Sequence, residues 1–123
     1  MMILYSGVDI EEIGRIRSVR PEVRKRFIQR ILNPVEQDRN LTDQSITGTF
    51  CAKEAVSKAL GCGIGPISWH EITILHDADS APRVELSGNA LERSKDLGIT
   101  NWTISISHSR HYAVATAIGY GEK

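Results

Sequence analysis

Apolar and polar residues alternate over three stretches of the chain, which is the pattern of strands with one buried face. The first stretch is residues 3–10. The second places Ile72 and Ile74 before a turn at residues 77–82, and Val84 and Leu86 after it, which predicts an antiparallel pair. The third runs from residue 102 to residue 118. A turn at residues 107–111 divides it into two further strands.

Apolar residues at steps of three and four predict helices over much of the remaining chain. One such run begins at Ile10 and continues to Val19. A helix is therefore expected directly after the first strand, with Asp9 at the junction. Pro21 can occupy the first turn of a second helix, in which the apolar residues share one face and arginines line another. Those apolar residues are Val23, Phe27 and Ile31.

The longest helical pattern begins at Thr42 or Asp43 and stops at Gly61. Its apolar face is wide, so we expect it to be the central helix of the fold. Ser87 can cap a last helix, which ends at Gly98.

Asn33, Pro34 and Glu36 are a cap residue, a first-turn proline and an acid at the third helical position, which together predict a short helix. We therefore interpret Glu36 as a capping residue and not as a catalyst. Strands and helices are segregated along the chain, with no repeat or linker. The expected fold class is α+β, with an antiparallel sheet packed on a long central helix, in a single domain of residues 1–123.

Composition excludes several classes of protein. The chain has 123 residues, 41% of them hydrophobic, and a formal net charge of zero, which is typical of a soluble globular domain and not of a disordered one. No apolar run reaches the length of a membrane span or a signal peptide. Cys51 and Cys62 are therefore expected to be reduced thiols in a cytoplasmic protein, and their spacing matches no zinc site.

Charge is concentrated in residues 15–30, which hold seven basic residues and one acid, a local charge of +6. This local charge has three possible interpretations: a solvated helix face, a docking surface for an acidic partner, or a nucleic-acid site. Phe27 is the one aromatic residue in the segment and its spacing puts it on the apolar face, which disfavours nucleic acid. The arginines nearest its start are Arg15, Arg17, Arg20 and Arg24.

Charged residues also interrupt the apolar pattern of the central helix. Glu54 and Lys58 are four residues apart and share a face, the spacing of an ordinary surface ion pair. The small and apolar residues around them indicate instead that they border the core. Two carboxylates from separate elements, such as Asp9 and Glu54, are a usual way to hold magnesium. Lys53 and Lys58 would then meet phosphate groups.

Six segments of the sequence resemble the phosphopantetheinyl transferases, in the order in which that family carries them. The length is similar to that of the short branch that contains the bacterial holo-acyl-carrier-protein synthases. The segments are GVDI at residues 7–10, FCAKEAVSKALG at 50–61, WHEI at 69–72, PRVELSG at 82–88, SISH at 105–108 and YAVA at 112–115.

This resemblance implies a fold, an activity and partners. The enzyme would move the phosphopantetheine arm of coenzyme A to a serine of apo acyl carrier protein, release adenosine 3′,5′-bisphosphate, and serve fatty acid biosynthesis. Asp9 and Glu54 would hold Mg²⁺ against the pyrophosphate, with Lys58 on a phosphate. Ser107 and His108, in the expected turn, would contact the nucleotide end of coenzyme A.

The basic segment would meet the acidic recognition helix of the carrier protein, beginning at Arg15. The family also implies a homotrimer with active sites between subunits. One departure is Ala81, where members of the family often carry a basic residue before the proline.

Two alternatives to the enzyme stay open: a coenzyme A or carrier-protein binding module without catalysis, and a nucleic-acid-binding protein. The sequence also does not decide which group accepts the proton of the carrier-protein serine: a metal-bound water, Glu54 or His108. A nucleophilic cysteine has no partner arrangement in the sequence.

Overall fold

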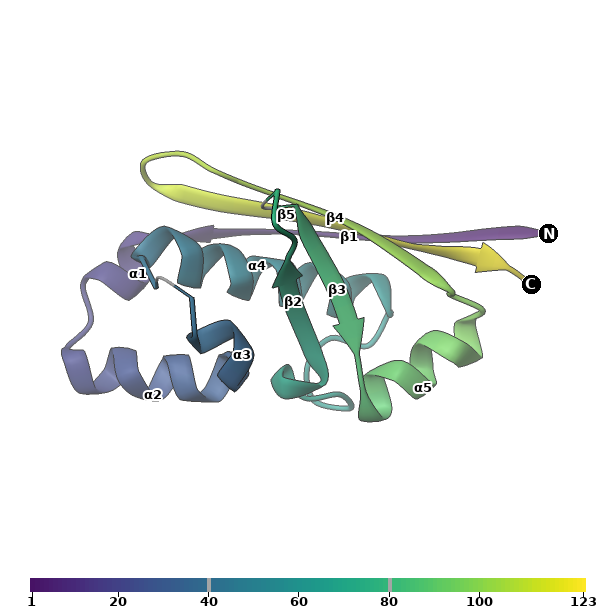
Figure 1. The fold of residues 1–123 in the computed structure, drawn as a ribbon, viewed down its shortest axis with the longest axis horizontal. Helices are drawn as coiled ribbons and strands as arrows, with labels where there is room; N and C mark the ends of the chain where they lie inside the picture. Colours follow the sequence, from purple (N-terminus) through teal and green to yellow (C-terminus); the bar gives the residue numbers. More distant parts are fainter. Residues whose placement is uncertain (40, 80) are drawn as a thin grey trace.

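The computed structural model describes residues 1–39, 41–79 and 81–123. Figure 1 shows a long sheet with the helices on one side of it. The elements in chain order are β1 (Met2–Glu12), α1 (Gly14–Arg17), α2 (Pro21–Ile31), α3 (Pro34–Gln37), α4 (Asp43–Ala59), a 3₁₀ turn η1 (Trp69–Glu71), β2 (Ile72–His76), β3 (Pro82–Leu86), α5 (Gly88–Leu97), β4 (Asn101–His108) and β5 (Tyr112–Glu122).

The main sheet has the strand order β1-β5-β4, and both pairings are antiparallel. β1 and β5 pair along their whole length, from Met2 opposite Glu122 to Glu12 opposite Tyr112. β2 and β3 form a separate hairpin with Ile72 opposite Leu86, as the alternation predicted. The α+β class with an antiparallel sheet is therefore confirmed.

Helix α4 packs along the inner face of the main sheet, and small residues make this close approach feasible. The inward residues of β5 include Ala113, Ala115 and Ala117, all buried. On β1 the inward Gly7 lies directly under the helix, since a Cβ there would lie 2.8 Å from the backbone nitrogen of Ala59. The core thus forms between α4 and a sheet face of very small side chains.

The first strand is longer than the sequence predicted, which corrects the placement of Asp9. β1 continues to Glu12, so Asp9 lies inside the strand, opposite Ala115, and not at a junction with a helix. The expected helix shrinks to the four residues of α1. Pairing with β5 supplies backbone hydrogen bonds over the whole segment, and this outweighs the three-residue apolar spacing. Ile10 is accordingly exposed.

The remaining helix boundaries are close to the predicted ones. α2 begins at Pro21, and α3 has the predicted capping box, in which Asn33 and Glu36 exchange side-chain and backbone bonds. α4 begins after the cap residue Thr42. α5 ends at Leu97 and is followed by the cap residue Gly98, whose φ of 82° favours glycine. Within the described part of the chain, no helix is both long and apolar enough to cross a membrane.

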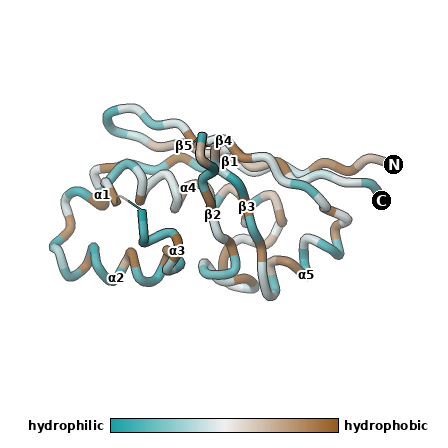
Figure 2. Tube along the Cα trace, in the orientation of Figure 1, coloured by the Kyte–Doolittle hydropathy of each residue, from teal (hydrophilic) through white to brown (hydrophobic). Residues whose placement is uncertain are grey.

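The outer face of the main sheet carries exposed apolar side chains. Along β1 the hydrophobic colour recurs towards the N-terminus in Figure 2. Among the described residues no helix covers this face, because the helices all lie on the inner side (Figure 1). Its large exposed residues on β1 are Met2, Leu4, Val8 and Ile10, each at least 56% exposed.

Candidate functional site

Asp9 and Lys58 meet between the edge strand β1 and helix α4. Asp9 points inward and is 9% exposed. Lys58 Nζ lies 3.1 Å from Asp9 Oδ1 and donates a second hydrogen bond, of 3.0 Å, to the carbonyl oxygen of Val8. The sequence spacing had allowed an ion pair between Glu54 and Lys58. In the described structure Lys58 pairs with Asp9 instead.

Glu54 is half-buried on the same side of α4, one turn before Lys58. Burial raises the pKa of Glu54, the negative charge of Asp9 raises it further, and Lys58 partly opposes the shift. The two carboxylates predicted as metal ligands are therefore brought close enough to repel each other.

Glu11 is a third carboxyl at this place, and the sequence reasoning missed it. It follows Asp9 by two residues, so both side chains leave β1 on the inner face. The pKa of Glu11 is raised to about 7, first by burial, then by a hydrogen bond and the charge that it shares with Asp9. The period of two along the strand was the signal that would have found it.

The electrostatics of this cluster fit a cation. Asp9 Oδ2 is buried and has no hydrogen-bond partner among the described residues when both carboxyls are ionised. A proton on Glu11 would give this oxygen a hydrogen bond, and a metal ion would use it as a ligand. The three carboxyls influence one another but do not converge as a complete ligand set, since within the described residues no group of three or more His, Cys, Asp or Glu side chains could hold a metal ion. Asp9 and Glu54 would thus give two ligands and leave the other positions to water and phosphate oxygens, as Mg²⁺ prefers.

Lys53 does not join this cluster. Its side chain is fully buried, and Nζ lies 2.7 Å from Glu36 Oε1 while donating to the carbonyl oxygens of Ile31 and Trp69. Glu36 in turn accepts from the backbone nitrogen of Ile74. All three hydrogens of the ammonium are used, so the structure does not support the phosphate-binding role predicted for Lys53.

A cavity of about 280 Å³ lies between the start of α4, the β2–β3 hairpin and the end of β4. We call it the His76 cavity. His108 lines it, but Ser107 does not, because neighbouring strand residues point to opposite faces of the sheet. Both are the last residues of β4 and not part of the predicted turn. The full lining is Arg39, Gln44, Ser45, Gly48, Thr49, His76, Pro82, Ile106 and His108.

The His76 cavity and the Asp9 cluster lie on different sides of α4. Successive residues of an α-helix are about 100° apart, so Glu54 and Lys58 fall on one stripe while Gly48 and Thr49 fall on another. The first stripe faces edge strand β1 and the second faces edge strand β4. One chain therefore presents two separate polar sites.

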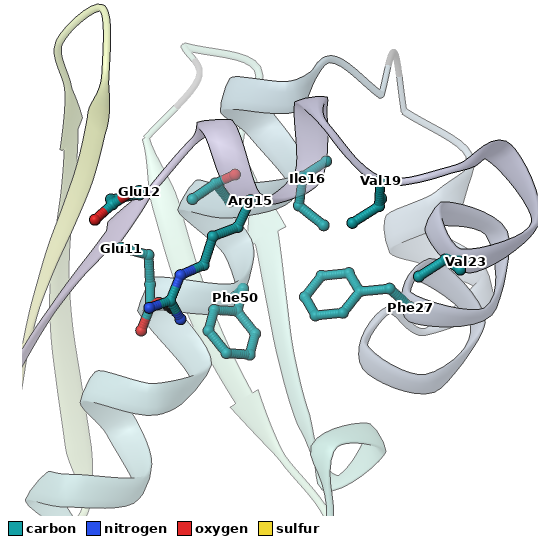
Figure 3. A pocket seen from close by; sticks show the side chains of 9 residues that line it. Glu11, Glu12, Arg15, Ile16, Val19, Val23, Phe27 and Phe50 are labelled. Atoms are coloured by element: carbon teal, nitrogen blue, oxygen red, sulfur yellow. Dashed lines mark ion pairs between the residues drawn. The ribbon is translucent and has the colours of Figure 1, made fainter.

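The basic segment borders an apolar groove next to the Asp9 cluster. Figure 3 shows Phe27 and Phe50 in this groove, with the Arg15 side chain reaching towards Glu11. The groove has a volume of about 170 Å³, and the two phenyl rings are 5.4 Å apart between centroids. The full lining is Glu11, Glu12, Arg15, Ile16, Val19, Val23, Phe27, Thr47 and Phe50.

The arginines of this segment are held by acidic neighbours to different degrees. Arg17 and Arg24 both pair with Asp43, at 3.5 and 3.4 Å. Arg15 and Arg20 are largely exposed, and their acidic partners are on their own local segment. Arg15 and Arg20 are thus better placed than Arg17 and Arg24 to meet a partner.

Comparison with known proteins agrees with this geometry. Residues 6–117 match the model of the 4′-phosphopantetheinyl transferase superfamily. The holo-[acyl-carrier-protein] synthase of Natranaerobius thermophilus is 43% identical over 95% of this chain and 97% of its own length.

Solved structures of similar proteins have the same fold. The Helicobacter pylori holo-[acyl-carrier-protein] synthase, solved in complex with coenzyme A, is 34% identical, with a TM-score of 0.79, over 93% of this chain and 98% of that one. The Plasmodium yoelii holo-ACP-synthase superposes with a TM-score of 0.84 at 28% identity, over 100% and 99% of the two chains.

Proposed function

This chain belongs to the 4′-phosphopantetheinyl transferase superfamily, and we propose that it is a Mg²⁺-dependent holo-acyl-carrier-protein synthase that acts in fatty acid biosynthesis. The observation that supports this most is the Asp9 cluster, where a buried carboxylate oxygen without a partner faces Glu54 and Lys58. A binding module without catalysis would have little reason to keep such a cluster, because uncompensated buried charge is destabilising.

In the reaction, the hydroxyl oxygen of the carrier serine attacks the phosphorus that bears the pantetheine arm. The bond from that phosphorus to adenosine 3′,5′-bisphosphate breaks, and the bisphosphate leaves with the electron pair. Bound Mg²⁺, held by Asp9 and Glu54, would neutralise charge on the pyrophosphate. Lys58 Nζ, now paired with Asp9 Oδ1, is near enough to the cluster to contact a phosphate oxygen.

The serine proton needs an acceptor near the Asp9 cluster. In one chain the carboxylates of Glu54 and Glu11 face Asp9, whereas His108 lines the cavity on the other side of α4. A carboxylate is therefore the acceptor that one chain offers. His108 can take part only from another subunit.

The basic segment and the groove beside it suit an acidic carrier-protein helix. Arg15 and Arg20 would pair with its carboxylates, Arg17 and Arg24 would add positive potential, and the groove that Phe27 and Phe50 line would take an apolar side chain. The groove adjoins Glu11, so a helix bound there would hold its neighbouring serine close to the Asp9 cluster. This arrangement places both substrates at one site.

The separation of the two polar sites favours an assembly. We propose a homotrimer in which the Asp9 cluster of one subunit and the His76 cavity of another together bind one coenzyme A. The exposed apolar face of β1 supplies a surface that a second copy would cover. Ser107, on β4, lies on the same outer face of the main sheet, where it would border the interface. We place the reaction in the cytoplasm, which agrees with the free thiols of Cys51 and Cys62.

The direct test is intact-mass analysis of apo acyl carrier protein after incubation with this chain, coenzyme A and Mg²⁺. We expect a gain of one phosphopantetheine arm that a chelator abolishes. Asp9→Asn and Glu54→Gln keep the side-chain shapes and should each lower turnover by at least about 100-fold. No gain of mass, with folded protein and bound coenzyme A, would refute the transferase.

A further inference from the structure

Cys51 lies in the interior of the Asp9 cluster, where α4 contacts the main sheet. Its side chain is fully buried, and Sγ lies 3.3 Å from the carbonyl oxygen of Ala113. Ala113 is opposite Glu11 in the sheet, and Asp9 is the neighbouring inward residue of β1. On α4, Cys51 precedes Glu54 by three residues and so shares its side of the helix. The thiol therefore lies among the carboxyl groups of the site.

The thiol of Cys51 keeps its proton, so it is a hydrogen-bond donor and not a nucleophile. The pKa of Cys51 is raised to about 12, first by burial and then by the negative charges of Asp9 and Glu11. A hydrogen-bonding contact with the Asp9 side chain acts in the same direction. Cys51 thus brings a neutral, weakly donating S–H group to Asp9.

Asp9 has an acceptor oxygen that this donor would satisfy. Asp9 is 9% exposed, Lys58 pairs with Oδ1, and Oδ2 is buried without a hydrogen-bond partner among the described residues. Lys58 is a movable partner, because half of its side chain is exposed, whereas Cys51 is fixed in the core. The hydrogen of a thiol rotates about the Cβ–Sγ bond. It can therefore turn from the carbonyl oxygen of Ala113 to Oδ2, which is charged and so the stronger acceptor.

We propose that Cys51 is a positioning residue of the transferase, whose S–H donates to Asp9 Oδ2 and holds this carboxylate in the orientation that binds Mg²⁺. The proposal rests on the proposed function, in which Asp9 is a metal ligand. Removing a group that orients a ligating side chain typically lowers metal affinity by about 10–100-fold. A thiol is a weak donor, so we expect a loss at the lower end of that range.

Infrared spectroscopy of the S–H stretch tests the hydrogen bond directly, without metal or substrate. The chain has two cysteines, so in a Cys62→Ser background the band reports Cys51 alone. The pH is set well above 7, where Glu11 has lost the proton that it could donate to Asp9. Asp9→Asn should then shift the band to higher frequency, since an amide oxygen accepts more weakly than a carboxylate. Glu54→Gln, one turn further along α4, is the matched control and should leave the band in place. A band that Asp9→Asn does not move would overturn the proposal.

The affinity for Mg²⁺ tests the positioning role. It is obtained from the rise in melting temperature with Mg²⁺ alone, because a ligand that binds only the folded chain stabilises it. Cys51→Ala should raise the Mg²⁺ concentration needed for a given rise by about tenfold. Cys51→Ser leaves a space of similar size but keeps a donor, so it should stay within about threefold of the wild type. Equal losses in the two variants would show that Cys51 only fills space, and would refute the positioning role.

The positioning role and the transferase fail in different ways. If the carrier protein gains the arm with Mg²⁺ but Cys51→Ala binds Mg²⁺ as tightly as the wild type, the Cys51 proposal is wrong and the transferase stands. If the S–H band and the Mg²⁺ affinity change as expected but the carrier gains no mass, the transferase is wrong and the role of Cys51 at Asp9 stands. A wild-type chain whose melting temperature does not respond to Mg²⁺ would overturn both the positioning role and the metal dependence of the transferase.

Discussion

Glu11 and Asp9 leave β1 on the same face, and the burial of Glu11, reinforced by its hydrogen bond with Asp9 and the charge of Asp9, makes the stability of the protein depend on pH. The pKa of Glu11 rises from 4.5 to about 7 on folding. Between these values the folded chain holds more protons than the unfolded chain, so stability falls as pH rises from about 4.5 to about 7. Without metal, the melting temperature should therefore decrease over this range.

Glu11→Gln removes this titration. We expect its melting temperature, measured without metal, to fall less between about pH 5 and about pH 8 than that of the wild type. Parallel curves for the two proteins would show that Glu11 does not titrate in this range.

Lys53 and Glu36 hold five segments together, since Lys53 on α4 bonds the end of α2 and η1 and pairs with Glu36 on α3, while Glu36 also bonds β2. Lys53→Met leaves the Glu36 carboxylate buried without its partner and should cost about 3–5 kcal/mol in urea unfolding. The double variant with Glu36→Gln should recover part of this loss. A cost below about 1 kcal/mol would mean that the pair is not structural.

At the scale of elements, the site forms because β1 lies close to α4. Gly7 permits this short distance between the strand and the helix. A Cβ at Gly7 would collide with the backbone of Ala55 and lie 2.8 Å from the nitrogen of Ala59. Gly7→Ala should therefore lower stability by more than about 3 kcal/mol, or lower turnover by displacing Asp9. Gly14→Ala is the control, because a Cβ there meets nothing within 4 Å. Equal effects of the two variants in thermal unfolding and turnover would contradict this account.

The basic segment should affect the carrier protein and not coenzyme A. Arg15→Glu with Arg20→Glu should raise the KM for acyl carrier protein by at least about tenfold, since the rim charges that steer association are reversed. The KM for coenzyme A should change little. Lys95→Glu, an exposed charge reversal on α5, serves as the matched control. If both KM values rise together, the arginines contribute to the nucleotide site instead.

At the scale of the molecule, the trimer can be tested by mixing two inactive variants. Asp9→Asn damages the metal half-site and His108→Asp puts a negative charge into the His76 cavity. If each site uses one half from each of two subunits, some interfaces in mixed trimers combine two intact halves. Co-expression should restore up to roughly a quarter of wild-type activity, with a native mass near three times 13.6 kDa. A monomeric mass, or no restored activity in proven mixed trimers, would refute the shared site.

Much of the fold and part of the site could be predicted from the sequence. Period-two alternation located the strands, and Asn33, Thr42 and Gly98 marked helix ends, because hydrogen bonding within a few residues decides such features. The family followed from motifs whose order is itself a property of the sequence. Asp9, Glu54 and Lys58 were named in advance, and the structure brings them together.

Contacts between residues far apart in the chain were decided by tertiary structure alone. Pairing with β5 kept residues 10–12 in a strand despite their helical spacing. The docking of α4 turned Lys53 towards Glu36 and away from the Asp9 cluster. It also placed His108 on the opposite side of α4 from that cluster. Local patterns report which face of an element is apolar, but only the packing of small residues between α4 and the sheet determines which charged side chains meet.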